Sequence, residues 1–221
     1  MQVIRISDGV VELQEVSDVK RARLSEFFDA LVLQRGVATP VMPAGTVHFA
    51  ARDRFSTYTI EVPPQRRTVR FRPKEGREQE HSILLPWAIF LITFCAEALD
   101  ALRIYVRPKP LGTTSDLLHH VPFPNRYSDG LTCMGTFKFE VTAPTPEKIR
   151  AALNFYWSSN FTSEILDAFN GHVPDAIATK TGPKENWFHG WARLSQEDLD
   201  GVLWKPYKPL SEVVQQTLER R

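Results

Sequence analysis

The stretch ILLPWAIFLITFCAEALDALRIYVR, residues 83–107, decides the fold class. Its parts 83–94 and 102–107 are rich in β-branched and aromatic residues, which are typical of strands buried in a sheet. The most apolar run, 83–99, carries one acidic residue, is interrupted by Pro86 and lies at the lower length limit for crossing a bilayer. We therefore expect buried strands here rather than a membrane span.

Shorter strand-like runs precede this stretch, and turn-forming residues separate them. They cover 46–51, 57–62 and 68–72. Because short turns join successive runs, the pattern predicts an antiparallel meander.

The N-terminal residues show two further patterns. Residues 3–6 and 10–16 alternate around an Asp-Gly pair that tolerates the positive φ of a tight turn, so they predict a hairpin. A helix is predicted next, with Ser17 as its N-cap and Gly36 at its end. Its apolar face would consist of Leu24, Phe27, Phe28 and Leu31.

Helices are also predicted after the strands. Thr145 as N-cap and Pro146 at the first helical position predict the start of one helix. Apolar spacing predicts two more, over 163–169 and 211–219. Five aromatic residues of the tail are expected to pack in the core: Trp187, Phe188, Trp191, Trp204 and Tyr207.

The expected fold class is α+β, an antiparallel β-meander followed by helices. We divide the chain into an N-terminal hairpin and helix (1–40), a core (41–175) and a C-terminal Trp-rich extension (176–221). The three parts are expected to form one compact unit.

Composition and charge exclude several classes of protein. Hydrophobic residues make up 43% of the chain and charged residues 24%, which excludes wholesale disorder. The 27 basic and 26 acidic residues give a net charge of +1, which argues against a chain built as a whole to bind nucleic acid or anionic lipid. The two cysteines, Cys95 and Cys133, are too few for a disulfide-rich secreted scaffold, and we expect a cytoplasmic protein with reduced thiols.

The segment 108–135 breaks the strand pattern and is rich in Pro, Gly, Thr, Ser, Asn and Asp. An irregular segment of this length inside a compact domain is frequently functional. Pro124 fixes φ and Asn125 brings an amide donor. The Asp-Gly pair at 129–130 favours a turn, and Cys133 follows shortly after it. A thiol nucleophile and an amide that stabilises an oxyanion together point to acyl transfer.

The sequence FPNRYSDGLTC, residues 123–133, resembles the active-site motif of ubiquitin-conjugating (E2) enzymes. In that family a His-Pro-Asn triplet precedes a glycine and then the thioester-forming cysteine, at the same spacing. The strand 102–107 followed by Pro108, and the Cys-x-Gly at 133–135, are still more similar to the bacterial E2-like family, the prokaryotic group that includes PRTRC system protein B. The resemblance implies an E2 (UBC)-like core with an N-terminal hairpin and helix and a C-terminal helical extension. Phe123 stands where the E2 motif has histidine.

The resemblance also implies a function. Cys133 would accept a ubiquitin-like modifier as a thioester from an E1-like adenylating enzyme and transfer it to an amine, without a cofactor or metal. Asn125 would donate to the oxyanion or shape the loop. The other residues that would shape the loop are Pro124, Tyr127, Asp129 and Gly130. The alternative is a catalytically inactive α+β scaffold or assembly subunit, of a complex or a virion, that acts by protein contacts.

Two other groups of residues are candidates for chemistry or binding. His119 and His120 are adjacent, so they point to opposite sides of an extended chain and no metal site is expected, but either is a candidate acid or base if it lies near Cys133. Arg70 and Arg72 belong to a local basic cluster and share one face of a strand, where they could dock phosphates or an acidic protein patch. Nucleic-acid binding is not expected, because no aromatic stacking motif accompanies the arginines.

Overall fold

The computed structural model divides the chain into two compact units, Met1–Met42 and Pro43–Arg221, and each is described by itself. The structure describes residues 3–7, 10–15, 18–23, 42–73, 76–123, 125–135, 143–162 and 187–219.

The first unit contains a three-stranded antiparallel sheet. Strands β1 (Val3–Ser7) and β2 (Val10–Glu15) pair as the predicted hairpin, which is confirmed. Strand β3 (Asp18–Arg23) then pairs with β2. The prediction that a helix begins at Ser17 is therefore wrong for residues 18–23, because the open edge of β2 offers them backbone hydrogen bonds that outweigh a weak local helix preference. The rest of that predicted helix lies outside the described residues.

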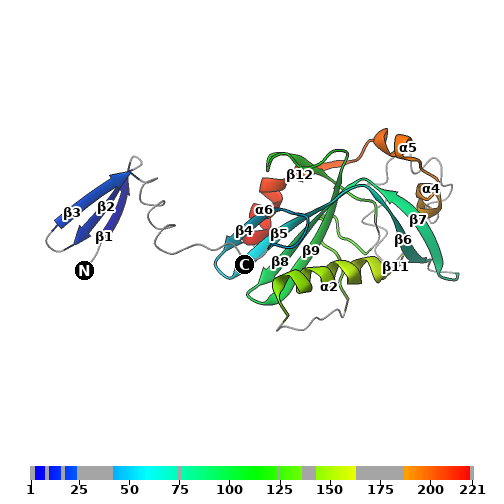
Figure 1. The fold of residues 1–221 in the computed structure, drawn as a ribbon, viewed down its shortest axis with the longest axis horizontal. Coiled ribbons are helices and arrows are strands. Elements are labelled where there is room, and N and C mark those ends of the chain that lie inside the picture. The colour runs from blue at the N-terminus through cyan, green and yellow to red at the C-terminus, as the bar shows by residue number, and fades with distance from the viewer. Residues whose placement is uncertain are drawn as a thin grey trace. The chain divides into compact units, whose positions relative to one another are not determined.

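The second unit is built on a six-stranded antiparallel sheet, ordered β12-β10-β9-β8-β5-β4 (Figure 1). Its strands are β4 (Thr46–Arg52), β5 (Phe55–Val62), β8 (Trp87–Cys95), β9 (Ala98–Arg107), β10 (Leu117–His119) and β12 (Pro206–Pro209). A smaller sheet, ordered β11-β6-β7, contains β6 (Gln65–Arg72), β7 (Gln79–Leu85) and β11 (Asn160–Thr162).

The predicted uninterrupted meander is wrong in one respect. Strands β6 and β7 pair with each other as a hairpin and leave β5 to pair with β8, although 62 and 87 are far apart in the sequence. The apolar run 83–94 is two strands, because Pro86 has no backbone N–H for a ladder and separates β7 from β8. The α+β class is confirmed by the large curled sheet with few helices.

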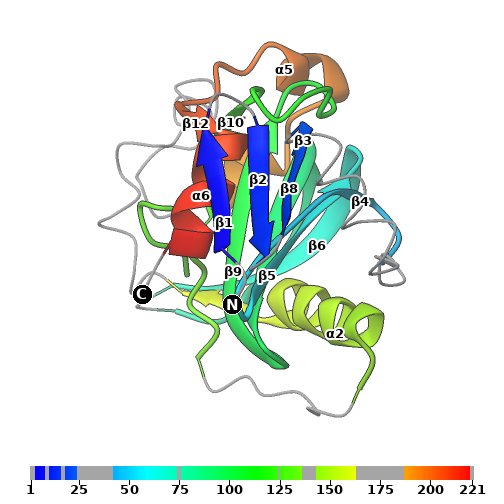
Figure 2. The same cartoon turned by 90° about the vertical axis from the view of Figure 1, so that its left-hand side faces the viewer.

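The central strand β8 is buried along almost its whole length because helices cover both faces of the sheet. Ile89 and Leu91 lie in a core cluster with residues of α6 (Leu210–Glu219). Phe90 points to the other face, where its ring meets Tyr156 of α2 (Thr145–Ser158) at 5.7 Å. Figure 2 shows α6 and α2 on opposite sides of the strands. A continuous apolar strand rather than an alternating one is what this double covering requires.

The C-terminal segment belongs to the same core. The short helices α4 (Trp187–Trp191) and α5 (Gln196–Asp200) precede β12 and α6. Trp191 is fully buried and donates from Nε1 to the carbonyl of Leu84 at 2.7 Å, and Trp204 is also buried. The predicted helix 211–219 is confirmed as α6.

The predicted N-cap of α2 needs correction, and one predicted helix cannot be compared with the structure. The N-cap of α2 is Pro144 rather than Thr145, and Pro146 lies in the first turn as expected. The Thr145 side chain instead hydrogen-bonds Tyr58 in the sheet. The predicted helix 163–169 lies outside the described residues. Within the described part of the chain, no helix is both long and apolar enough to cross a membrane.

Candidate functional site

Residues 125–133 form a short hairpin that ends at Cys133. The Cys133 N–H donates to the carbonyl of Asn125 at 2.7 Å, and the Tyr127 N–H donates to Leu131 at 2.7 Å. Gly130 closes the turn by donating to Tyr127 at 3.0 Å, and its φ of +85° is the left-handed conformation that follows such turns. The Asp-Gly pair therefore makes a turn, and that turn brings the cysteine back beside the asparagine.

The hairpin is attached to the edge of β9, next to the part that β10 covers. Leu131 bridges Arg103, and the Thr132 N–H donates to the carbonyl of Leu102 at 2.8 Å. The Ile104 N–H donates in turn to Gly130 at 3.1 Å. Because the large sheet holds one side of the hairpin, the backbone of Cys133 is fixed although its side chain is exposed.

Asn125 connects the hairpin to the smaller sheet. Its Nδ2 donates to the carbonyl of Asn160 at 3.0 Å, and its Oδ1 accepts from both the N–H and the hydroxyl of Thr162 at 3.3 Å. Its φ of +58° is left-handed, a conformation that asparagine tolerates better than most residues. The side chain thus binds strand β11, and one of its two Nδ2 hydrogens takes part in the bond to Asn160.

Arg126 anchors the hairpin from beneath. Its side chain is fully buried, and Nη1 donates to the carbonyl of Val121 at 3.0 Å. Its Nη2 lies 2.7 Å from Nδ1 of His120, and because a guanidinium only donates, this imidazole nitrogen accepts. Burial lowers the pKa of Arg126, and the nearby Tyr105 and Tyr156 hydroxyls partly oppose that shift.

Phe123 occupies the position of the E2 histidine and lies at the centre of an aromatic cluster. Its side chain is fully buried and stacks on Trp191 at 5.1 Å between ring centroids and on Phe161 at 5.6 Å. The rings of Trp157 and Phe188 contact it at 6.0 Å each. Stacking and burial therefore hold the start of the loop where the E2 family uses an imidazole.

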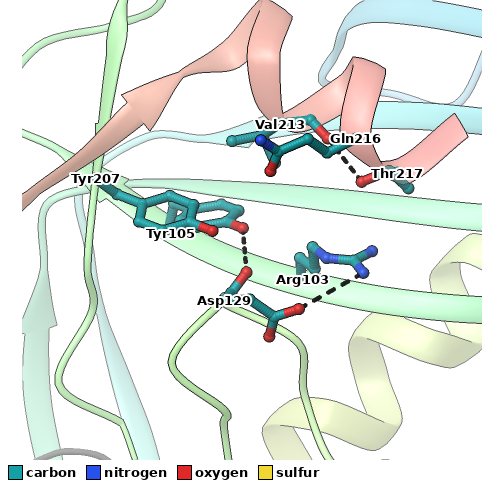
Figure 3. A pocket seen from close by; sticks show the side chains of 7 residues that line it. All are labelled: Arg103, Tyr105, Asp129, Tyr207, Val213, Gln216 and Thr217. Atoms are coloured by element: carbon teal, nitrogen blue, oxygen red, sulfur yellow. Dashed lines mark hydrogen bonds and ion pairs between the residues drawn. The ribbon is translucent and has the colours of Figure 1, made fainter. Parts of the chain in front are cut away.

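Behind the hairpin is a small cavity of about 30 Å³ between β9 and α6 (Figure 3). The Tyr105 hydroxyl donates to the carbonyl of Asp129 at 2.6 Å, and the Arg103 guanidinium lies 3.9 Å from the Asp129 carboxylate. Tyr105 stacks on Tyr207, and burial, reinforced by Tyr207, raises its pKa, so its hydroxyl stays a donor at physiological pH. A cavity of this size holds about one or two water molecules and no larger ligand.

The remaining predicted site residues are distributed as follows. His119 is half-buried on β10 opposite Val106, and its pKa is lowered by burial and by Arg107. Leu131 bridges β9 at Arg103, and the chain runs from there to Cys133 away from Val106, so His119 and Cys133 lie beside different parts of the strand. His120 is buried and contacts Arg126 of the hairpin. Pro124 lies outside the described residues. No group of three potential metal ligands occurs among the residues that the structure describes.

Arg70 and Arg72 are exposed on β6, where β11 pairs with them in parallel through Asn160 and Thr162. Since the same two residues bind Asn125, these arginines lie on the sheet that adjoins the cysteine hairpin. Cys95 ends β8 and is half-buried.

Sequence reasoning missed Arg126 and the aromatic environment of Phe123. A buried arginine next to an Asn in a polar loop gives no periodic signal. The sequence does mark an aromatic-rich tail that includes Phe188 and Trp191, but it shows neither the contact of this tail with the loop nor the part played by Phe161.

Comparisons with known proteins bear on this geometry. The family model described as prokaryotic E2 family D matches residues 24–187, which includes the hairpin, β4 to β11 and α2. No curated protein and no solved structure matches the chain significantly. The match covers most of the chain, and the chain belongs to prokaryotic E2 family D.

Proposed function

We propose that the protein is an E2-like acyl carrier whose nucleophile is Cys133. The observation that carries the proposal is an exposed thiol on a hairpin whose backbone is fixed, with Cys133 N–H bonded to Asn125 at 2.7 Å. Family membership supports a general E2-like role. A structural cysteine would more commonly be buried as a small apolar side chain.

The reaction consists of two exchanges at one carbonyl. The Cys133 thiolate attacks the thioester that joins the modifier to an E1-like partner, and the partner's thiolate leaves. An amine then attacks the new thioester, the Cys133 thiolate leaves, and the amine loses its proton to solvent or a base. Each exchange passes through an oxyanion, which a nearby N–H donor stabilises.

Asn125 serves this reaction in two ways. Its three hydrogen bonds to β11 hold the loop, which supports a loop-shaping role. The second Nδ2 hydrogen is the candidate donor to the oxyanion. His120 is assigned a structural role, because its Nδ1 accepts from the buried Arg126.

The test uses a chemical acyl donor, so no partner has to be identified. The folded protein is treated with the benzyl thioester of a peptide ending in Gly-Gly, and the acyl adduct is located by mass spectrometry and by its loss in hydroxylamine. Free lysine is then added and amide formation is timed. We expect acylation at Cys133 and discharge at least ten times faster from the folded than from the urea-unfolded adduct.

Matched variants sharpen this test. Cys133→Ala should abolish the adduct, and Cys95→Ala should leave it unchanged. Alkylation of both thiols across pH, with site assignment, compares their intrinsic reactivity. If Cys133 reacts no faster than Cys95 until the protein unfolds, or if discharge is equal in folded and unfolded adducts, the carrier proposal fails and the scaffold interpretation replaces it.

A further inference from the structure

We propose that the outer face of the smaller sheet binds an extended acidic segment of the modifier that Cys133 carries. We call this surface the arginine face and define it by Arg66, Arg70 and Arg72. The inference rests on the proposed function, because it assigns the partner of the same thiol a docking site.

The alternation of β6 creates the arginine face. Val69 and Phe71 are buried, and the ring of Phe71 meets Phe188 at 5.3 Å. Side chains in a strand alternate between faces, so the even-numbered residues of β6 point away from the core. All three arginines and Thr68 are exposed, which leaves a basic row on the outside of the sheet.

The neighbouring strands add polar groups to this face without neutralising it. Ser82 and Glu80 of β7 are exposed opposite Thr68 and Arg70, and Asn160 of β11 lies on the other side of Arg70. Arg70 Nε is 3.1 Å from Glu80, but the two side chains remain 53% and 60% exposed. A pair this exposed to solvent contributes little to stability, so Arg70 can exchange Glu80 for a carboxylate of a partner at little cost.

The spacing of the arginines fits an extended partner. Residues two apart on a strand are about 7 Å apart, which applies to Arg70 and Arg72. Alternate side chains of an extended acidic peptide have the same spacing. A guanidinium also binds a carboxylate in two parallel hydrogen bonds, a geometry that lysine does not provide.

The position of the face favours a partner held at Cys133. Asn125 binds the backbone of Asn160 and Thr162, and these residues pair with Arg70 and Arg72. Because the thioester would tether the modifier to the hairpin, its effective concentration at this face is in the millimolar range, and a weak ionic contact then suffices.

The composition of the face favours a protein over a nucleic acid. Among the described residues of β6, β7 and β11, every aromatic side chain points inward: Phe71, His81 and Phe161 are all buried. Single-stranded nucleic acids need exposed aromatic rings for base stacking.

The experiment measures fluorescence anisotropy with a labelled ten-residue peptide that carries Glu at alternate positions. The full chain is titrated at low and at physiological salt, alongside Cys133→Ala. The test variant is Arg70→Gln/Arg72→Gln. The matched control is Lys109→Gln/Arg150→Gln, which removes the same charge from two exposed positions elsewhere. Arg70→Lys/Arg72→Lys keeps the charge, and all variants are first checked for an unchanged urea midpoint.

We expect the test variant to lose at least tenfold in affinity, the lysine variant to be intermediate, and the control and Cys133→Ala to change less than twofold. The inference is overturned if the peptide does not bind, or if test and control variants lose affinity equally. It is also overturned if a labelled 20-nucleotide single strand binds more tightly than the peptide with the same dependence on the arginines. Peptide binding needs no thiol, so its failure and a failure of thioester formation are distinguishable.

Discussion

At the scale of single residues, Phe123 shows how this chain supports the loop without the E2 histidine. Its ring is fully buried and stacks on Trp191 and Phe161. An imidazole at this position would meet ring faces instead of hydrogen-bond partners. A histidine here would thus lose apolar contacts and bury polar nitrogens.

Phe123→His is therefore expected to lower the free energy of unfolding by about 2–4 kcal/mol. Urea unfolding followed by tryptophan fluorescence would measure this change. The control is Phe123→Leu, which stays apolar and should cost about 1.5 kcal/mol. Equal or greater stability of the histidine variant would mean that the imidazole finds a partner and that the aromatic account is wrong.

Gly130 is the residue on which the shape of the hairpin depends most directly. Its φ is +85°, and a Cβ would lie 2.4 Å from Cζ of the buried Tyr105. Gly130→Ala should therefore reduce the free energy of unfolding by about 2–4 kcal/mol through strain and overlap.

The matched control for that variant is Gly201→Ala, where φ is −85° and the closest atom to a new Cβ is 3.6 Å away. We expect a change of about 0.5 kcal/mol or less there. Two equal effects in urea unfolding would show that Tyr105 yields to the methyl group.

At the scale of elements, the loop between β9 and β10 forms hydrogen bonds with the first residues of α6. The Asp116 carboxylate accepts from Gly112 and Arg107 at 2.7 Å each, and its backbone carbonyl accepts from Leu210 at 3.0 Å. The N–H groups of Gly112 and Thr113, together with Arg107, lower the pKa of Asp116 to about 2.

This shift predicts a pH dependence with a definite sign. The pKa of Asp116 in the folded protein lies below the unfolded value of about 3.9. The ionised carboxylate therefore stabilises the folded state above about pH 4, and this stabilisation is lost as pH falls toward 2. Urea midpoints measured between pH 5 and pH 2.5 should fall for the wild type. The decrease should be smaller for Asp116→Asn, which has no carboxylate to protonate. Parallel curves would contradict the role of Asp116.

The strands that the sequence predicted are those with local signals. Runs of β-branched and aromatic residues correctly located β5, β8 and β9. The short strands β10, β11 and β12 were missed, because three- or four-residue segments acquire strand structure only from distant partners, such as β6 for β11. Strand β3, residues 18–23, was mistaken for helix because its pairing with the edge of β2, and not its local preference, decides its structure.

For the candidate site, too, the sequence predicted the local features and missed the contacts between distant residues. The Asp-Gly turn and the spacing from Asn125 to Cys133 are local, and the structure brings these two residues together. The supports of the hairpin are not local: Arg126 depends on burial, and Asn125 binds Asn160, which lies far along the chain. The sequence therefore indicates the reactive side chains, but not the distant residues that hold them in position.

At the scale of the whole molecule, the match to the family model ends at residue 187, whereas the second compact unit continues to Arg221. Strand β12 extends the large sheet beyond β10, and α6 covers the face that contains Ile89 and Leu91. Trp191 packs on Phe123 and bonds to β7. Residues 187–219 therefore complete the core and support the cysteine hairpin.

A chain that ends at residue 186 is accordingly expected to lose cooperative unfolding and to bind a hydrophobic dye, because one face of β8 would be exposed. Removal of residues 1–42 is the comparison of similar length. Because those residues form a separate unit, the remaining chain should keep a sharp urea transition at the midpoint of the full-length protein. If the chain ending at 186 unfolds as sharply as the full-length protein, then the family-matched region is itself a complete fold, and α6 and Trp191 stabilise it only as additions.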